Sequence, residues 1–184
     1  MQKKFYLLFI TAILMTLVAC PPAETPVTAD PLSADDAIVD TKWQDDYTGW
    51  NSYTSTDASW DCQIKVGLVM TASYGVQEGT IYHKKINNTS GYIYYKISNP
   101  TAFRYSKKAA TDYKDKWYAI YYKDLTENSV QMCDAYPSFE TRDASDDDKI
   151  ADYHCADSLS AAIKTFTVEK KYFAWPTAFT KVSE

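Results

Sequence analysis

The sequence predicts its β-structure most clearly in two stretches, GYIYYKI at residues 91–97 and WYAIYY at residues 117–122. Both are rich in tyrosine and isoleucine, which favour strands, and both place large side chains on the two alternating faces of a strand. Tyrosine suits either face, because its ring packs against apolar neighbours while its hydroxyl group reaches water. We therefore expect a tyrosine-rich antiparallel sheet.

Neighbouring segments supply further strands. Residues 62–70 alternate between apolar and polar with period two, which predicts a half-buried strand. Residues 79–86 and 91–97 predict a hairpin, since asparagine in the linker at residues 87–90 tolerates left-handed backbone angles. Residues 116–125 and 129–136 predict a second hairpin, and residues 74–77 a turn. Weaker strand signals lie at residues 47–54 and 103–105.

One helix is expected near the C-terminus, where apolar residues recur at helical spacing from Leu159 to Phe166. Asp157 or Ser158 is placed to cap its first turn. The following residues, 167–175, return to strand composition and stop at Pro176.

These elements predict a mainly β fold of about seven or eight strands with one short C-terminal helix. Short sequential hairpins favour an up-and-down meander, and such a meander removes its exposed edges by closing into a small barrel. A β-sandwich is the alternative.

The order of barrel, helix and last strand resembles the calycin architecture of lipocalins. It is also similar to small β-domains of spirochaete lipoproteins of unknown function, over about residues 60–175. The Gly-x-Trp motif of lipocalins is absent, because Trp50 follows Gly49 directly. The resemblance implies an envelope lipoprotein and brings no catalytic residues with it.

The N-terminus carries an export signal. Lys3 and Lys4 precede an apolar run at residues 5–18, which is shorter than the roughly 20 residues of a membrane span. The run ends in Leu17-Val18-Ala19-Cys20, which resembles the lipobox of bacterial lipoproteins. The resemblance implies that residues 1–19 are a signal peptide and that acyl chains such as palmitate on Cys20 anchor the protein in a membrane of the cell envelope. The outer membrane is favoured, with the domain in the periplasm or at the cell surface.

Residues 20–41 follow as a lipidated cysteine and a tether. Pro21, Pro22, Pro26 and Pro31 interrupt any helix, and several aspartates keep the segment solvated. We expect a flexible tether here and a single β-rich domain over residues 42–184.

Export to an oxidising compartment favours one disulfide among the three remaining cysteines. Cys62 shares the apolar face of its strand with Ile64 and is expected to be a buried thiol. A Cys133–Cys155 disulfide would close the polar segment between these residues into a loop. The loop-entropy model gives such a bond a stabilisation on the order of 3 kcal/mol.

Five tryptophans and sixteen tyrosines are more than a small core needs. They either fill a barrel or form a cleft in which aromatic rings stack on a ligand. The candidate ligand-binding residues are Trp50, Trp60, Tyr94, Trp117 and Tyr121.

Several functions are disfavoured. A net charge of −5 argues against nucleic-acid binding. The acidic run from Asp143 to Asp157 has no glycine turn and no EF-hand spacing, so we expect a solvated loop and no metal or cofactor. His83, beside Lys84 and Lys85, is expected on an exposed face, and no nucleophile turn accompanies it.

The sequence therefore predicts a non-enzymatic, lipid-anchored binding module of the bacterial envelope. Its expected partners are the membrane, through acylated Cys20, and a host protein, an envelope component or a small hydrophobic ligand. One alternative is a carrier with a cavity inside the barrel. Another is an unrecognised hydrolase, which requires Asp152, His154 and Asp157 to converge.

Overall fold

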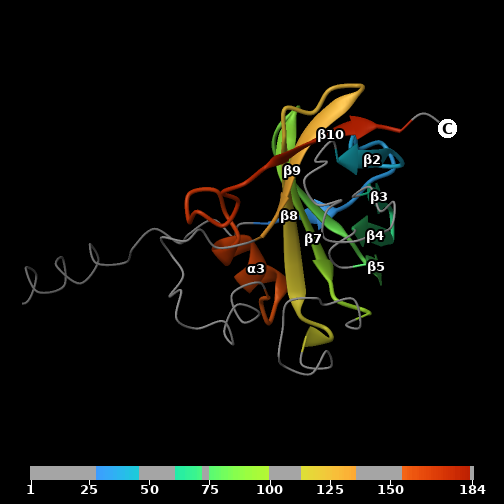
Figure 1. Ribbon diagram of the computed structural model, residues 1–184. Coiled ribbons are helices and arrows are strands. Elements are labelled where there is room, and N and C mark those ends of the chain that lie inside the picture. Colours follow the sequence, from blue (N-terminus) through green and yellow to red (C-terminus); the bar gives the residue numbers. More distant parts are fainter. Residues whose placement is uncertain (1–27, 46–60, 72–74, 100–112, 136–154, 183–184) are drawn as a thin grey trace, which may run out of the picture.

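The computed structural model describes residues 28–45, 61–71, 75–99, 113–135 and 155–182, which form one antiparallel sheet and one short helix (Figure 1). The elements are β1 (Asp30–Pro31), β2 (Lys42–Asp45), β3 (Asp61–Lys65), β4 (Leu68–Thr71), β5 (Gly75–Glu78), β6 (Tyr82–Asn87), β7 (Ser90–Lys96), β8 (Trp117–Lys123), β9 (Ser129–Asp134), α3 (Leu159–Thr165) and β10 (Thr177–Lys181). The ten strands lie in the order β1-β6-β7-β8-β9-β10-β2-β3-β4-β5. A mainly β fold with one short C-terminal helix is thus confirmed.

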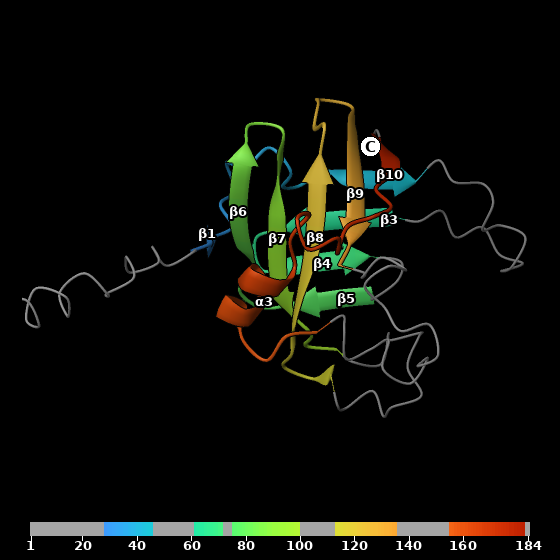
Figure 2. The same ribbon diagram turned by 90° about the vertical axis from the view of Figure 1, so that its left-hand side faces the viewer.

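The sheet is not closed into a barrel, so that prediction is wrong. Its two outermost strands are β1 and β5, and they do not pair with each other. The sheet instead bends so that strands β3 to β5 cross behind strands β6 to β9 (Figure 2). The arrangement resembles the alternative sandwich in having two facing halves, but both halves belong to one continuous sheet.

Hydrogen bonds of two side chains, and not strand pairing, connect β5 to the half of the sheet that contains β7. The Gln77 amide group donates to the backbone carbonyl of Asn99 and accepts from its N–H group, each at 2.9 Å. The Ser98 hydroxyl accepts from the Glu78 N–H group at 2.7 Å. These hydrogen bonds connect β5 to the segment that follows β7, while the sheet stays open between β1 and β5.

Both predicted hairpins are confirmed, since their turns depend on local chemistry. In the β6–β7 turn, the Asn87 side chain accepts from the Thr89 N–H group at 2.8 Å. In the β8–β9 turn, the Thr126 N–H group donates to the Ser129 carbonyl at 2.8 Å.

The predicted single strand at residues 62–70 is wrong, because it is the hairpin of β3 and β4. Gly67 supplies the turn with a φ of +83°, and Lys65 pairs with Leu68 across it. The turn changes which alternate residues face inward, so Ile64 and Val69 are both buried. The predicted turn at residues 74–77 overlaps β5, which is a strand.

The helix α3 begins as predicted, with Ser158 as its cap accepting from the Ala161 N–H group at 3.1 Å. The strand expected at residues 167–175 is not formed, since the chain turns there with Lys171 at a φ of 60°. The last strand, β10, begins after Pro176 and lies between β9 and β2. The weak strand signals at residues 47–54 and 103–105 lie outside the described residues.

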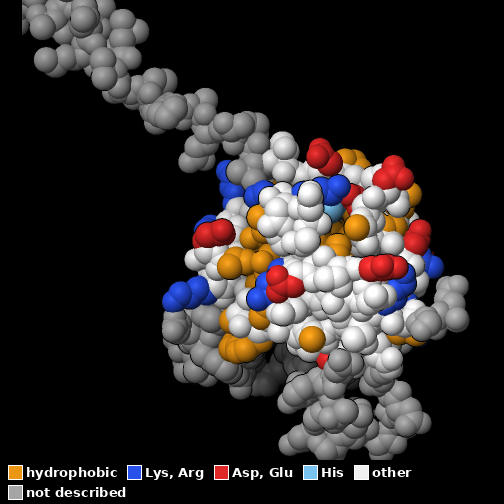
Figure 3. Space-filling model, turned by 90° about the horizontal axis from the view of Figure 1, so that it is seen from above, with side chains coloured by type: hydrophobic (Ala, Val, Ile, Leu, Met, Phe, Trp, Pro, Cys, Tyr) orange, Lys and Arg blue, Asp and Glu red, His pale blue; other side chains and the backbone are white. Residues whose placement is uncertain are grey.

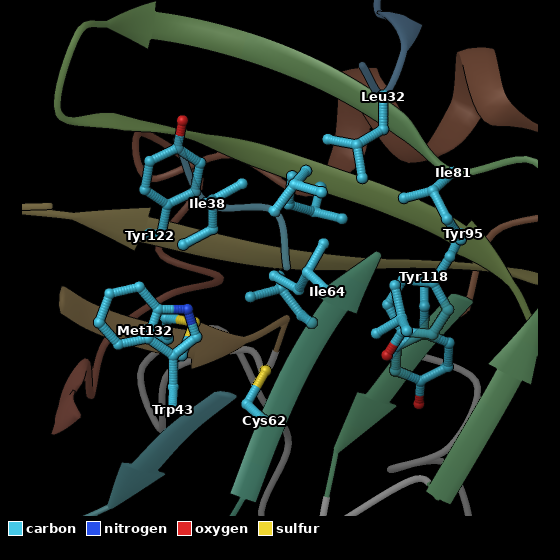
Figure 4. Packing of buried hydrophobic residues seen from close by; sticks show 14 of the residues in the cluster. Leu32, Ile38, Trp43, Cys62, Ile64, Ile81, Tyr95, Tyr118, Tyr122 and Met132 are labelled. Atoms are coloured by element: carbon cyan, nitrogen blue, oxygen red, sulfur yellow. The ribbon is translucent and has the colours of Figure 1, made fainter. Parts of the chain in front are cut away.

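The segment between β1 and β2, residues 32–41, packs across the core, and we call it the strap. Leu32, Ile38 and Val39 are buried in the main core, and Figure 4 shows Leu32 and Ile38 within it. The Leu32 N–H group donates to Ile81, and the Asp40 N–H group donates to Ile64. The tether prediction therefore fails for these residues, and the folded domain begins before residue 42. Residues 20–27 lie outside the described part of the chain.

The two faces of the central strands are both covered. Alternate residues of β7 and β8, such as Ile93 and Tyr118, face the main core between the two halves of the sheet. The intervening residues, such as Tyr94 and Ala119, face a second cluster beneath α3 on the other side (Figure 1). This double burial explains why these strands carry apolar and aromatic side chains on both faces.

Replacing Ile38 with alanine tests whether the strap belongs to the folded core. Ile38 has an exposed fraction of 0%, so Ile38→Ala is expected to lower the free energy of unfolding by about 2–5 kcal/mol through lost burial and a cavity. Val66→Ala is the matched control, because Val66 is 57% exposed and should change stability by less than about 0.5 kcal/mol. Urea unfolding measures both. Equal stabilities of the two variants would contradict packing of the strap.

Candidate functional site

A cluster of titratable side chains, which we call the clasp, consists of the buried Asp36, His83 and Tyr122 together with Lys85, which is 62% exposed. The Asp36 carboxylate lies 3.1 Å from His83 Nδ1 and 2.5 Å from Lys85 Nζ, and it accepts from the Ser33 N–H group at 3.0 Å. On the other side of the ring, His83 Nε2 lies 2.8 Å from the Tyr122 hydroxyl group. The clasp thus joins the strap to β6 and β8.

Strand alternation places these side chains together. His83 lies two residues after buried Ile81 and faces the same side of β6, and Tyr122 faces that side from β8. Gly91 of β7 lies between them. A Cβ atom on Gly91 would come within 2.8 Å of the Lys84 carbonyl and 2.9 Å of the Tyr122 hydroxyl. The absence of a side chain at this position leaves room for the His83–Tyr122 hydrogen bond.

The environment fixes the protonation states of the clasp. Burial lowers the pKa of His83 below its ordinary value, and this outweighs the opposing effect of Asp36. Burial alone would raise the pKa of Asp36, but hydrogen bonds from Lys85, the Ser33 backbone and His83 bring it below its ordinary value. Burial, with a smaller effect of the Asp36 charge, raises the pKa of Tyr122 to about 12. At neutral pH the neutral ring therefore donates from Nδ1 to Asp36 and accepts at Nε2 from Tyr122.

A pocket of about 340 Å³ lies beside the clasp, lined in part by Asp30, Ser33, Lys84 and Lys85. On the face that Figure 3 shows, charged side chains of both signs are interspersed with apolar ones.

Both ring nitrogens of His83 are already bonded within the protein. Tyr122 is only 2% exposed, and its raised pKa makes it a poor nucleophile. The chemistry of the clasp is therefore suited to holding the strap.

The expectation for His83 is wrong, since the residue is only 5% exposed. Its two lysine neighbours suggested a solvated face, but the informative neighbour is Ile81, which has the same strand parity. Asp36, which the sequence analysis assigned to the tether, is likewise buried. Nothing local to Asp36 identifies its partner, because His83 and Tyr122 reach it only through the tertiary fold.

Three of the candidate ligand-binding residues come together on the α3 side of the sheet. Tyr94, Trp117 and Tyr121 belong to or pack against the second cluster. The Tyr121 ring centroid lies 5.3 Å from that of Tyr92 and 5.5 Å from that of Phe173. Ligand binding by these residues stays a prediction, and Trp50 and Trp60 lie outside the described residues.

The cysteines form no disulfide bond within the described residues, so the predicted Cys133–Cys155 bridge is not formed. Cys133 packs against the second cluster and Cys155 against the main core, on opposite faces of the sheet. Cys62 is buried, as predicted. Burial, with the nearby Asp134 charge, raises the pKa of the Cys133 thiol to about 12, which suppresses its reactivity.

The hydrolase alternative requires Asp152, His154 and Asp157 to converge. Asp157 forms an ion pair with Lys116, whereas Asp152 and His154 lie outside the described residues, so their convergence is untested. Within the described ranges, no group of three His, Cys, Asp or Glu side chains is placed to hold a metal ion. Asp134 at the end of β9 was missed, and burial raises its pKa to about 7.

Comparison of the chain with protein-family models, with curated proteins and with solved structures gives no match. In the part of the chain that the structure describes, no helix has the length and apolar character needed to cross a bilayer.

Replacing Tyr122 with phenylalanine tests the clasp. The change removes the hydroxyl donor and leaves His83 Nε2 buried without its partner, so Tyr122→Phe should lower the free energy of unfolding by about 1–3 kcal/mol. Tyr94→Phe is the matched control, because the buried Tyr94 hydroxyl has no hydrogen-bond partner among the described residues. This control should cost less than about 0.5 kcal/mol. If urea unfolding finds the two changes equally costly, the His83–Tyr122 bond contributes nothing specific.

Proposed function

We propose that this chain is a lipoprotein of the bacterial cell envelope, anchored by acyl chains on Cys20, whose β-domain is a non-enzymatic binding module. The anchoring rests on the positive start, the apolar run and the sequence Leu17-Val18-Ala19-Cys20. Two or more acyl chains at about 0.8 kcal/mol per buried CH₂ group give a stable anchor. We favour the outer membrane as its location.

The observation that carries the binding-module proposal is the filling of the space between the two halves of the sheet. Trp43, Tyr95 and Tyr118 occupy this space together with Ile64 and Ile93, and all five are almost completely buried. A carrier of a small hydrophobic molecule uses a mostly apolar cavity of about 300–1,000 Å³. The pocket beside the clasp reaches that size range, but charged and polar side chains line it. Binding is therefore assigned to the outer surface.

The outer surface offers exposed apolar side chains that suit contact with a larger partner. Trp175 is 47% exposed just before β10, and Val168 lies exposed after α3. Tryptophan is enriched among residues that dominate binding energy at protein interfaces. A host protein or another envelope component fits such a surface better than a small molecule does.

Replacing Cys20 with alanine tests the anchor. Cys20→Ala should abolish acylation, because the thiol that carries the acyl chain is gone, and should release the protein from the membrane fraction. Incorporation of labelled palmitate and the mass of the N-terminal peptide measure this result. Cys133→Ala is the matched control and should retain both the label and the membrane location. A membrane-bound, labelled Cys20→Ala protein would refute the proposed anchor.

Native mass spectrometry tests the binding module against the carrier. The protein purified from the envelope should show the same mass under native and denaturing conditions, because its covalent acyl chains are retained in both and side chains fill the interior of the sheet. An excess of a few hundred daltons that disappears on denaturation would overturn the proposal in favour of a carrier. The excess mass would also identify the class of ligand.

A further inference from the structure

Besides its backbone hydrogen bonds to Ile81 and Ile64, the strap is held to the sheet by the Asp36 carboxylate. Asp36 accepts from Ser33 within the strap and bonds to His83 and Lys85 on β6. The His83 ring continues this chain of hydrogen bonds to Tyr122 on β8. The polar link between the strap and β8 therefore passes through the imidazole ring, whereas Lys85 gives Asp36 a second link to β6.

That ring fits its surroundings in only one protonation state. A neutral imidazole has one donor and one acceptor, and both are used when Nδ1 donates to Asp36 and Nε2 accepts from Tyr122. A protonated ring has two donors, so Nε2–H would then face the hydroxyl hydrogen of Tyr122. Because Tyr122 is buried and Gly91 packs against both groups, turning the hydroxyl away requires a new acceptor in a confined space.

We infer that the strap is an acid-sensitive latch, in which protonation of His83 weakens the clasp and increases the fraction of molecules whose strap has left the sheet. Opening that also separates β1, which directly precedes the strap, would uncover the outer edge of β6 and the apolar side chains beneath Leu32 and Ile38. An uncovered strand edge is a template for pairing with another chain. This inference goes beyond the proposed function and does not rest on lipid anchoring.

The charged groups around His83 set the direction of the effect. Asp30 of β1 lies directly opposite His83 in the sheet, Asp36 lies on the strap, Lys85 on β6 and Tyr122 on β8. Burial lowers the pKa of His83 most, the two aspartates oppose this and Lys85 adds to it, so the pKa falls below the ordinary 6.5. The closed strap thus disfavours the protonated ring. Its stabilisation is complete above pH 6.5 and is lost as the pH falls below that value.

Two other groups titrate differently and are separable. Hydrogen bonds keep the pKa of Asp36 below its ordinary 3.8 despite burial, so its contribution is lost only in stronger acid. Burial raises the pKa of Asp134 to about 7, so acidification below pH 7 relieves a buried charge and stabilises the fold. The global unfolding temperature combines these opposite effects, which is why the test must be local to the strap.

Hydrogen–deuterium exchange of the purified protein between about pH 5 and pH 7.5 provides that test. After correction for the intrinsic exchange rate, peptides from residues 28–41 should exchange faster as the pH falls, by at most about tenfold per pH unit, the limit for one proton. Peptides from β8 should change little. Asp134→Asn should keep the response of the strap, and His83→Gln should remove it. A wild-type strap that does not respond to pH, or a response that persists in His83→Gln, would overturn the latch.

Titration of the imidazole groups by nuclear magnetic resonance keeps the inference testable even if His83→Gln fails to fold. His83→Gln is not needed here, because His154→Gln identifies which of the two histidine signals belongs to His83. The His83 signal should titrate below the ordinary value of 6.5. Titration at or above that value would refute the latch.

Discussion

The structure depends on the burial of both faces of β7 and β8. Their alternate side chains need two separate coverings, and each covering comes from a different part of the chain. Strands β2 to β5 pack across one face, where Trp43 and Ile64 share a buried cluster with Ile93 and Tyr118. The helix α3 and the turn that follows it cover the other face, where Phe166 and Phe173 meet the tyrosines. The bend of the sheet buries one face of β7 and β8, and the position of the helix buries the other.

Buried polar side chains add to the strand pairing at both ends of the sheet. Gln77 joins β5 to the backbone beyond β7, and Asp36 joins the strap, which continues from β1, to β6. A buried polar group is costly unless its hydrogen bonds are made, so each of these contacts specifies one arrangement more strictly than apolar packing does. In a closed barrel, backbone hydrogen bonds hold every strand. Here a change in one side chain, such as protonation, can weaken the attachment of an edge of the sheet.

Local chemistry decided which parts of the fold were predictable from the sequence. The two hairpins and the start of α3 were correct, because asparagine turns and the Ser158 cap act within a few residues. The β3–β4 turn at Gly67 was missed, since the apolar alternation continued through it. The barrel, the tether over residues 32–41 and the exposed position of His83 were wrong because they depended on contacts between distant segments. In the sequence, for example, nothing distinguishes Asp36 from a solvated aspartate. Its buried environment arises only when the fold brings His83 of β6 and Tyr122 of β8 to the strap.

The strap also limits how far the domain can stand from a membrane. Since it is folded against the sheet, only the residues between Cys20 and Thr28 remain to separate the proposed lipid anchor from the first described residue. Eight Cα-to-Cα steps at about 3.5 Å each reach at most about 28 Å. With the proposed anchor on Cys20, so short a connection would keep the domain beside the lipid headgroups, where it would meet its partners. Release of the strap together with β1 would lengthen this connection, so one segment would control both the exposure of the sheet edge and its distance from the membrane.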